Sequence, residues 1–186
     1  MFEKSVGELT ELGAQITTAR LLSSPSFGVI RSTSIARIRR PSSFLAEARA
    51  MGEGRLSVVF TGAGTSDYVG DTCAPYLRHP GNTDLYDFKP IATTDIVSAP
   101  RDFLRAEDPT LVVSFARSGN SPESLAAVAV AKELVHNVKF LNITCAPEGK
   151  LAVESADDPN ALTLLIPRAN DKGFAMTVHL HDPALH

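Results

Sequence analysis

The chain has 186 residues, of which 44% are hydrophobic and 21% charged, and its formal net charge is −3. This composition predicts one folded domain with a substantial core and excludes a disordered chain. A negative balance, 6% aromatic residues and no tryptophan argue against nucleic acid as a partner.

The remaining global features concern membranes, compartments and metals. The charged amino-terminal residues do not form a signal peptide, and no apolar stretch is long enough to span a membrane, so we expect a cytoplasmic protein. Cys73 and Cys145 lie far apart in apolar surroundings, which favours buried free thiols over a disulfide. Neither is near a second cysteine or a histidine cluster, so we expect no metal site, and no motif calls for another cofactor.

Residues 1–54 are predicted to form an amino-terminal helical segment. A helix is expected over 5–20, where Leu9, Leu12 and Ile16 repeat at helical spacing. Four arginines fall within 31–40 and could face an anionic partner, although a solvated helix face is the favoured interpretation. Pro41 interrupts the pattern, and Ser42 or Ser43 could cap a second helix that ends by residue 54.

The first strong strand is predicted over 56–61 and leads into the loop Gly62-Ala63-Gly64-Thr65-Ser66. A helix is predicted over 67–77, with Val69, Cys73 and Leu77 on its buried stripe. The loop begins like a dinucleotide-binding fingerprint, but Asp67 stands where that motif needs a small residue. Thr65 and Ser66 offer hydroxyls to a polar ligand. The alternative is a tight turn in which Ser66 only caps the helix, and this loop alone slightly favours it.

Four more strands are predicted, over 85–88, 111–115, 138–144 and 162–166, with helices over 122–135 and 150–153. Residues 92–98 form either a short helix or a loop that lines a site. The alternative is that Thr94 or Asp95 caps a turn before Pro100. The alternation of strands and helices predicts an α/β fold, a doubly wound five-stranded parallel sheet.

The loop after the strand at 111–115 reads Ala116-Arg117-Ser118-Gly119-Asn120-Ser121, and Pro122 then opens a helix. Unpaired N–H groups and the helix dipole make such a terminus suitable for an anion such as phosphate. Ser118, Ser121 and Asn120 add side-chain donors. The alternative is that Ser121 is an ordinary N-cap followed by proline. Both loops leave carboxyl ends of strands, so we expect them to converge on one ligand crevice.

Four segments in this order resemble the AgaS family of sugar isomerase (SIS) domain proteins. They are Thr61–Ser66, Ala92–Ser98, Ser114–Ser124 and Asn170–Thr177. The resemblance covers about 17–177 and implies a flavodoxin-like three-layer SIS domain over 55–177, followed by an atypical tail over 178–186. It also implies phosphosugar-binding residues: Gly64, Thr65, Ser66, Arg117, Ser118, Gly119, Asn120, Ser121 and Asn170, the last beside Asp171.

The family resemblance implies an isomerase or deaminase acting on a hexose 6-phosphate, such as galactosamine 6-phosphate or tagatose 6-phosphate. AgaS-type proteins resemble tandem SIS proteins about twice this length, and their second domain is expected to carry the acid and base. We therefore expect a homo-oligomer, with the arginine-bearing helices as contacts. Glu148 is a weak candidate base, and His179 and His181 a weak candidate metal pair. The alternatives are a truncated, non-catalytic phosphosugar-binding module and, less favoured, a nucleotide-binding domain.

Overall fold

A computed structural model describes residues 41–78 and 81–166. The chain divides into two units, 1–47 and 48–186, and everything below concerns the second unit except the start of one helix. Several predictions lie outside the described residues. These are the helix at 5–20, the arginine cluster at 31–40, Asn170 with Asp171, the paired histidines and the tail at 178–186.

The sheet has five strands in the order β2-β1-β3-β4-β5, and every neighbouring pair is parallel. The strands are β1 (Leu56–Gly62), β2 (Tyr86–Pro90), β3 (Thr110–Ala116), β4 (Val138–Thr144) and β5 (Ala161–Leu165). All five predicted strands are present, with ends that differ from the prediction by two residues or fewer. The predicted doubly wound α/β fold is therefore confirmed.

The first described helix, α2 (Pro41–Arg49), begins at the proline itself. Neither Ser42 nor Ser43 can be its N-cap, so that prediction is wrong. Proline suits the first turn of a helix because an N–H at that position would have no intrahelical partner, so nothing is lost when proline lacks it. The turn after α2 contains Gly54 at φ 88°, a left-handed backbone that glycine adopts without strain.

Helix α3 (Asp67–Leu77) packs on the sheet through its smallest residues. Gly70 and Ala74 are buried, whereas Val69, Cys73 and Leu77 are only partly buried, so the predicted stripe is rotated by one residue. A Cβ on Gly70 would lie 2.9 Å from Cβ of Phe60 on β1. Close approach to the strand therefore requires glycine at this position.

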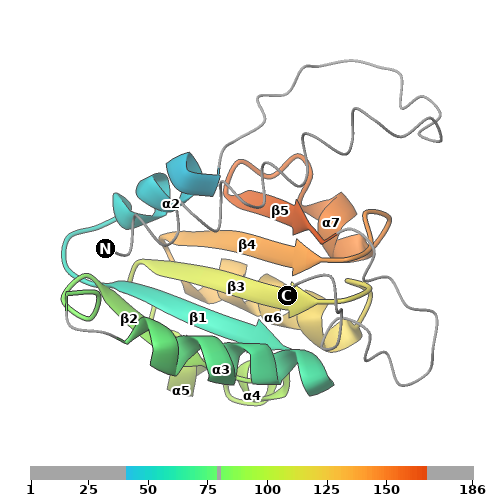
Figure 1. Cartoon of the computed structure of the whole chain (residues 1–186), viewed down its shortest axis with the longest axis horizontal. Helices are drawn as coiled ribbons and strands as arrows, with labels where there is room; N and C mark the ends of the chain where they lie inside the picture. The colour runs from blue at the N-terminus through green and yellow to red at the C-terminus, as the bar shows by residue number, and fades with distance from the viewer. Residues whose placement is uncertain (1–40, 79–80, 167–186) are drawn as a thin grey trace. The chain divides into compact units, whose positions relative to one another are not determined.

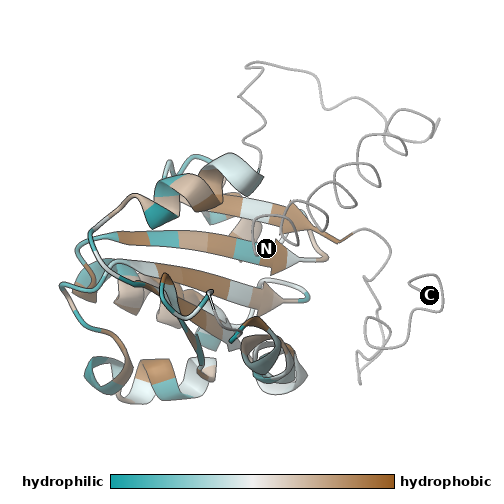
Figure 2. Cartoon of the chain, turned by 60° about the vertical axis from the view of Figure 1, so that its left-hand side comes forward, coloured by the Kyte–Doolittle hydropathy of each residue, from teal (hydrophilic) through white to brown (hydrophobic). Residues whose placement is uncertain are grey.

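Helices cover both faces of the sheet (Figure 1). Helix α3 lies in front of the sheet, and α4 (Thr93–Ser98), α5 (Pro100–Phe103) and α6 (Pro122–Leu134) lie behind it. The core on the α6 side joins Val59, Val112 and Phe140 of the strands to Ala127 and Ala131 of α6. Figure 2 shows the strands largely in the brown of apolar residues. This is the expected three-layer arrangement, since buried parallel strands are apolar on both faces.

A row of polar side chains crosses the sheet near the carboxyl ends of the strands. Thr61 pairs in register with Ser114, Ser114 with Asn142, and Asn142 with Thr163. The first three are buried. Each follows a core residue of its own strand, Val59, Val112 or Phe140, by two positions and therefore lies on the same face of the sheet. The row thus marks where the apolar core ends and the polar edge of the sheet begins.

The strand order places the ends of β1 and β3 side by side at the centre of the sheet. The chain runs outward from β1 to β2 on one side and to β3, β4 and β5 on the other. In a sheet of this order, the loops after these two strands diverge to opposite faces and leave a crevice between them. The two hydroxyl-rich loops are the ones that follow β1 and β3.

Candidate functional site

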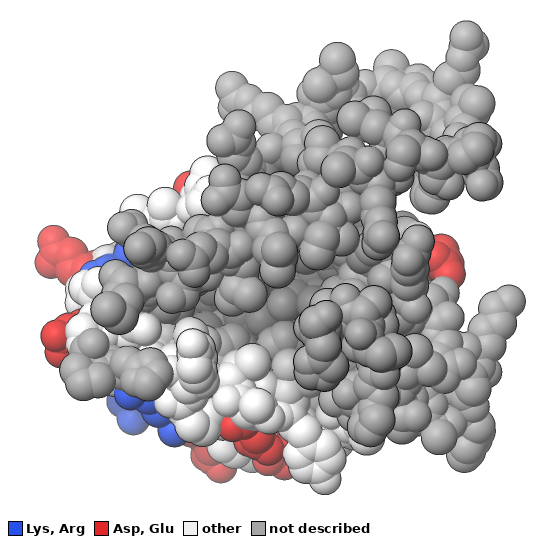
Figure 3. Space-filling view, in the orientation of Figure 1, with Lys and Arg blue, Asp and Glu red and all other residues white. Residues whose placement is uncertain are grey.

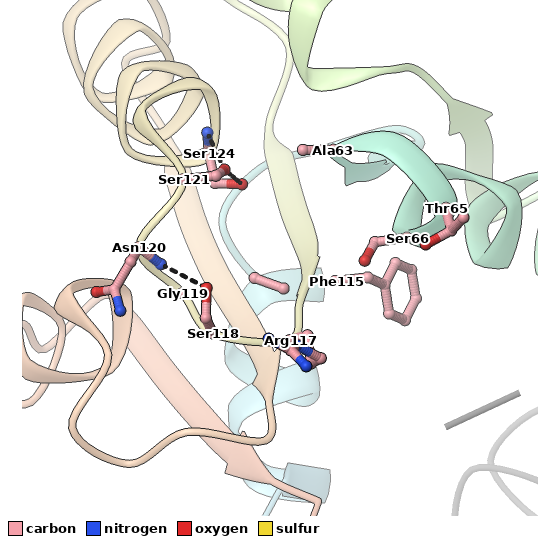
Figure 4. Close-up of a pocket in the computed structure, with 11 residues that line it drawn as sticks. Ala63, Thr65, Ser66, Phe115, Arg117, Ser118, Gly119, Asn120, Ser121 and Ser124 are labelled. Carbon is pink, nitrogen blue, oxygen red and sulfur yellow. Dashed lines mark hydrogen bonds between the residues drawn. The ribbon is translucent and has the colours of Figure 1, made fainter. Parts of the chain in front are cut away.

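A cleft of about 360 Å³ opens at this point, between the loop after β1 and the loop after β3. Its volume falls within the range of roughly 300–1,000 Å³ that is typical of small-molecule sites. Eleven residues line it: Ala63, Thr65, Ser66, Phe115, Ala116, Arg117, Ser118, Gly119, Asn120, Ser121 and Ser124 (Figure 4). The structure thus brings seven of the nine predicted site residues together. Gly64 does not line the cleft, and Asn170 lies outside the described residues.

Ser121 forms the N-cap of α6. Its hydroxyl oxygen accepts a hydrogen bond from the backbone N–H of Ser124 at 3.2 Å, and its hydroxyl donates to Oγ of Ser124 at 2.7 Å. Pro122 follows at the first helical position. The expected cap is therefore present, and the Ser121 hydroxyl group is engaged within the helix terminus.

Ser118 and Gly119 form the turn that carries the chain from β3 to α6. Gly119 has φ 65°, a conformation that a side chain would strain. The hydroxyl oxygen of Ser118 accepts a 3.4 Å bond from the backbone N–H of Asn120. Because that bond uses only the oxygen, the Ser118 hydroxyl hydrogen can still donate to a ligand.

The loop 116–121 is braced from behind by residues 144–151, which end in the first turn of α7 (Lys150–Glu154). The carbonyl oxygen of Arg117 accepts from Oγ1 of Thr144 and from the N–H of Cys145, each at 3.1 Å. The Gly119 carbonyl accepts from the Leu151 N–H at 2.9 Å. These bonds join the loop to the end of the neighbouring strand and so hold its backbone in place.

The side chain of Asn120 belongs to the same brace. Its Oδ1 accepts from the backbone N–H of Lys150 at 2.9 Å. Figure 4 shows this side chain directed away from Phe115 and Ser66. The backbone N–H of Asn120 already donates to Ser118, so Nδ2 is the donor that remains for a ligand. Gly149 completes the contact, because a Cβ on it would lie 2.1 Å from the carbonyl oxygen of Ser118.

The loop after β1 contains a short 3₁₀ helix, η1 (Gly64–Ser66), before α3 begins. Ser66 occupies the N-cap position of α3, as one interpretation of the sequence predicted, but it has helical dihedral angles and its side chain makes no capping hydrogen bond. The extra turn leaves the hydroxyls of Thr65 and Ser66 at the cleft.

Residues 92–98 support this loop rather than line the cleft. They form α4, as one of the sequence interpretations predicted, and the buried Thr93 donates to the carbonyl oxygen of Gly62 at 3.0 Å. Neither Thr94 nor Asp95 caps the helix, whose N-cap is Ala92.

Arg117 is the cation that lines the described cleft. It lies close to Cys145, where burial raises the pKa of the thiol and the guanidinium partly offsets that rise. Glu123, in the first turn of α6, is exposed and lies outside the cleft lining, so it leaves room for an anion.

Aspartate and glutamate side chains gather over α3 at the lower edge of Figure 3. Burial, together with Asp71 and Asp95, raises the pKa of Asp67 there.

The described cleft holds neither a carboxylate nor an imidazole. Glu148 is exposed and is not part of the lining. Within 41–78 and 81–166, no three His, Cys, Asp or Glu side chains are grouped as a metal ion would require.

Over the same residues, no helix has the length and apolar character needed to cross a membrane. Both cysteines are free and half-buried rather than fully buried.

Four lining residues were not predicted from the sequence: Ala63, Phe115, Ala116 and Ser124. Phe115 could have been found from strand alternation, because its neighbour Ser114 faces the α6 side. Ser124 lies three residues after an N-cap serine, a position that faces the cap.

No family model matches the chain, but individual proteins do. It is 45% identical over 124 residues to D-galactosamine-6-phosphate deaminase AgaS of Escherichia coli, covering 66% of this chain and 31% of that protein. It is 38% identical over 174 residues to the protein of that name from Shewanella sp. (strain ANA-3), covering 93% and 45%.

Among solved structures, tagatose-6-phosphate ketose/aldose isomerase from Escherichia coli superposes with a TM-score of 0.66 at 40% identity. The match covers 73% of this chain and 36% of that one. The chain therefore spans less than half the length of each of these relatives.

Proposed function

Because the chain belongs to the AgaS-like family of SIS (sugar isomerase) domain proteins, we propose that its cleft binds a hexose 6-phosphate. Galactosamine 6-phosphate and tagatose 6-phosphate are the candidates that the relatives' names suggest. One observation carries the proposal: the loop 116–121 opens α6 at a cleft that it shares with Thr65 and Ser66.

The phosphate is proposed to bind at the loop 116–121. The dipole of the 13-residue α6 favours negative charge at its start. Pro122 has no N–H and the N–H of Ser124 donates to Ser121, so among the first three helical residues Glu123 offers its N–H to an anion. Ser118 supplies a hydroxyl donor, and Arg117 supplies positive charge. Ser121 holds the helix terminus through Ser124, so its contribution is to the shape of the site.

The sugar hydroxyls are proposed to contact Thr65 and Ser66 on the other side of the cleft. Isomerisation and deamination both need a base that moves a proton beside a carbonyl or imine carbon. Since the described cleft contains no such group, we propose that a second subunit completes the site. Light scattering should then find a dimer or larger assembly, and a monomer at micromolar concentration would count against it.

The test is calorimetric titration of the protein with galactosamine 6-phosphate. Unphosphorylated galactosamine is the ligand control, and Ser118→Ala is the site variant. Ser98→Ala, an exposed serine on α4 outside the cleft, is the matched control. Because a hydrogen bond to a charged group contributes about 1.5–3 kcal/mol, Ser118→Ala should weaken binding at least about tenfold. Equal affinities for both sugars would refute a phosphate site.

Turnover separates the enzyme from the alternative, a phosphosugar-binding module. Ammonia release from galactosamine 6-phosphate, or ketose–aldose conversion of tagatose 6-phosphate, would establish an active enzyme. Phosphate-dependent binding with neither reaction would favour the module.

A further inference from the structure

Four aromatic rings form a row across one face of the sheet, and the row ends in the cleft. Tyr86 stacks on Phe88 at 5.7 Å between ring centroids, Phe88 on Phe60 at 6.0 Å, and Phe60 meets Phe115 at 6.1 Å. Phe60 and Phe88 are buried, whereas Phe115 is only partly buried and lines the cleft. The last ring of the row is therefore both held by its neighbour and open to a ligand.

The neighbouring strand leaves the ring of Phe115 uncovered. Its register partner on β1 is Gly62, which has no side chain. A Cβ on Gly62 would lie 2.5 Å from the backbone of Ser66, so glycine is needed there to fold the loop back. Figure 4 shows the ring beside Ser66, between the loop after β1 and the loop after β3.

The cleft thus has two kinds of lining. Hydroxyls from both loops supply hydrogen bonds, while Ala63, Phe115 and Ala116 supply an apolar surface. A hexose likewise has polar and apolar surfaces, since its hydroxyls point outward and its C–H bonds can form an apolar face. The face of an aromatic ring is negative and attracts polarised C–H groups.

We propose that Phe115 is a specificity-determining residue, on whose ring the carbon chain of the bound sugar packs while its phosphate occupies the loop 116–121. This inference rests on the proposed function, because it requires a sugar phosphate in the cleft. It adds a contact that distinguishes the sugar from phosphate alone. The tilted contact with the ring of Phe60 holds the ring of Phe115 before the ligand arrives, which lowers the entropic cost of binding.

The experiment compares two ligands, galactosamine 6-phosphate and inorganic phosphate, by calorimetric titration. Phe115→Leu keeps an apolar side chain without the ring, and Phe115→Tyr keeps the ring. Phe88→Leu is the matched control, because it disturbs the same aromatic row at a buried position outside the cleft.

Phe115→Leu should weaken galactosamine 6-phosphate about three- to tenfold, as expected for loss of an aromatic contact, and leave inorganic phosphate within about twofold. Phe115→Tyr should retain the affinity for the sugar phosphate, and Phe88→Leu should leave the ratio of the two affinities unchanged.

If the wild type binds both ligands and Phe115→Leu leaves their ratio unchanged, the inference fails and the proposed function stands. The same conclusion follows if Phe88→Leu changes the ratio as much. If the wild type binds neither ligand, the proposed function fails and the inference fails with it.

Discussion

Replacing Gly149 by alanine is expected to separate the loop 116–121, which lines the cleft, from residues 144–151, which brace that loop. The new Cβ would lie 2.1 Å from the carbonyl oxygen of Ser118 and 3.2 Å from that of Ala146. Both contacts are with backbone atoms, so no side chain can rotate away. Residues 144–151 and the loop 116–121 must therefore move apart by about 1 Å to reach an ordinary contact distance.

The expected loss of stability in Gly149→Ala can be estimated from the contacts that the new Cβ disturbs. Overpacking costs about 1–3 kcal/mol. The movement also weakens the two 2.9 Å bonds, from Leu151 to the Gly119 carbonyl and from Lys150 to Asn120, each of which contributes about 0.5–1.5 kcal/mol. We expect the free energy of unfolding to fall by about 2–4 kcal/mol. Phosphate affinity should fall at least about tenfold, since a displacement of this size misplaces the donors.

Urea unfolding and calorimetric titration with inorganic phosphate measure the two effects. The matched control is Gly52→Ala, whose Cβ would have its three nearest contacts, from 3.1 Å, with the side chain of Pro109, and which should change stability by less than about 1 kcal/mol. Gly149 has φ −64°, an ordinary value, so alanine would otherwise stabilise the chain by restricting its unfolded state. An unchanged or higher stability of Gly149→Ala would therefore refute the reasoning.

Two further predictions concern negative charge, one in the cleft lining and one at the start of α3. Asn120→Asp keeps an acceptor for the Lys150 N–H, so stability should stay within about 0.5 kcal/mol, while the added negative charge should weaken phosphate binding about tenfold; equal phosphate affinity in a titration would contradict this. The pKa of Asp67 is raised by burial and by Asp71 and Asp95, so ionising Asp67 destabilises the fold. Asp67→Asn should therefore be more stable than the wild type at pH 7 and equally stable below the ordinary pKa of 3.8, where both are neutral; a difference that is independent of pH in urea unfolding would exclude the carboxylate as its cause.

The sheet could be predicted from the sequence because its strands contain continuous apolar runs, such as Val58-Val59-Phe60, separated by polar turns. The loops at the carboxyl ends followed from the order of strands and helices. The buried face of α3 was misjudged because hydrophobicity favours Val69 and Cys73, whereas close packing on Phe60 selects Gly70 and Ala74. Periodicity weighs apolar size, but a helix that lies close to a strand needs small residues.

The brace behind the loop 116–121 could not have been predicted in the same way. The contact between Gly149 and Ser118 depends on how two loops more than 25 residues apart meet in space. No local pattern encodes such a distance. Asn120 shows the consequence, since its sequence position indicates a ligand donor, while in the structure its oxygen is bonded to Lys150.

Because the cleft lies between the loops after β1 and β3, it forms only when these two strands have paired. Thr61 and Ser114 are register partners although they are 53 positions apart in the sequence, so the two halves of the cleft do not meet in a chain that has formed only local structure. A ligand that needs both halves binds only the folded state and stabilises it by mass action. Protection of the β1 and β3 amides from hydrogen exchange should therefore rise with ligand concentration, which links occupancy of the site to the lifetime of the fold.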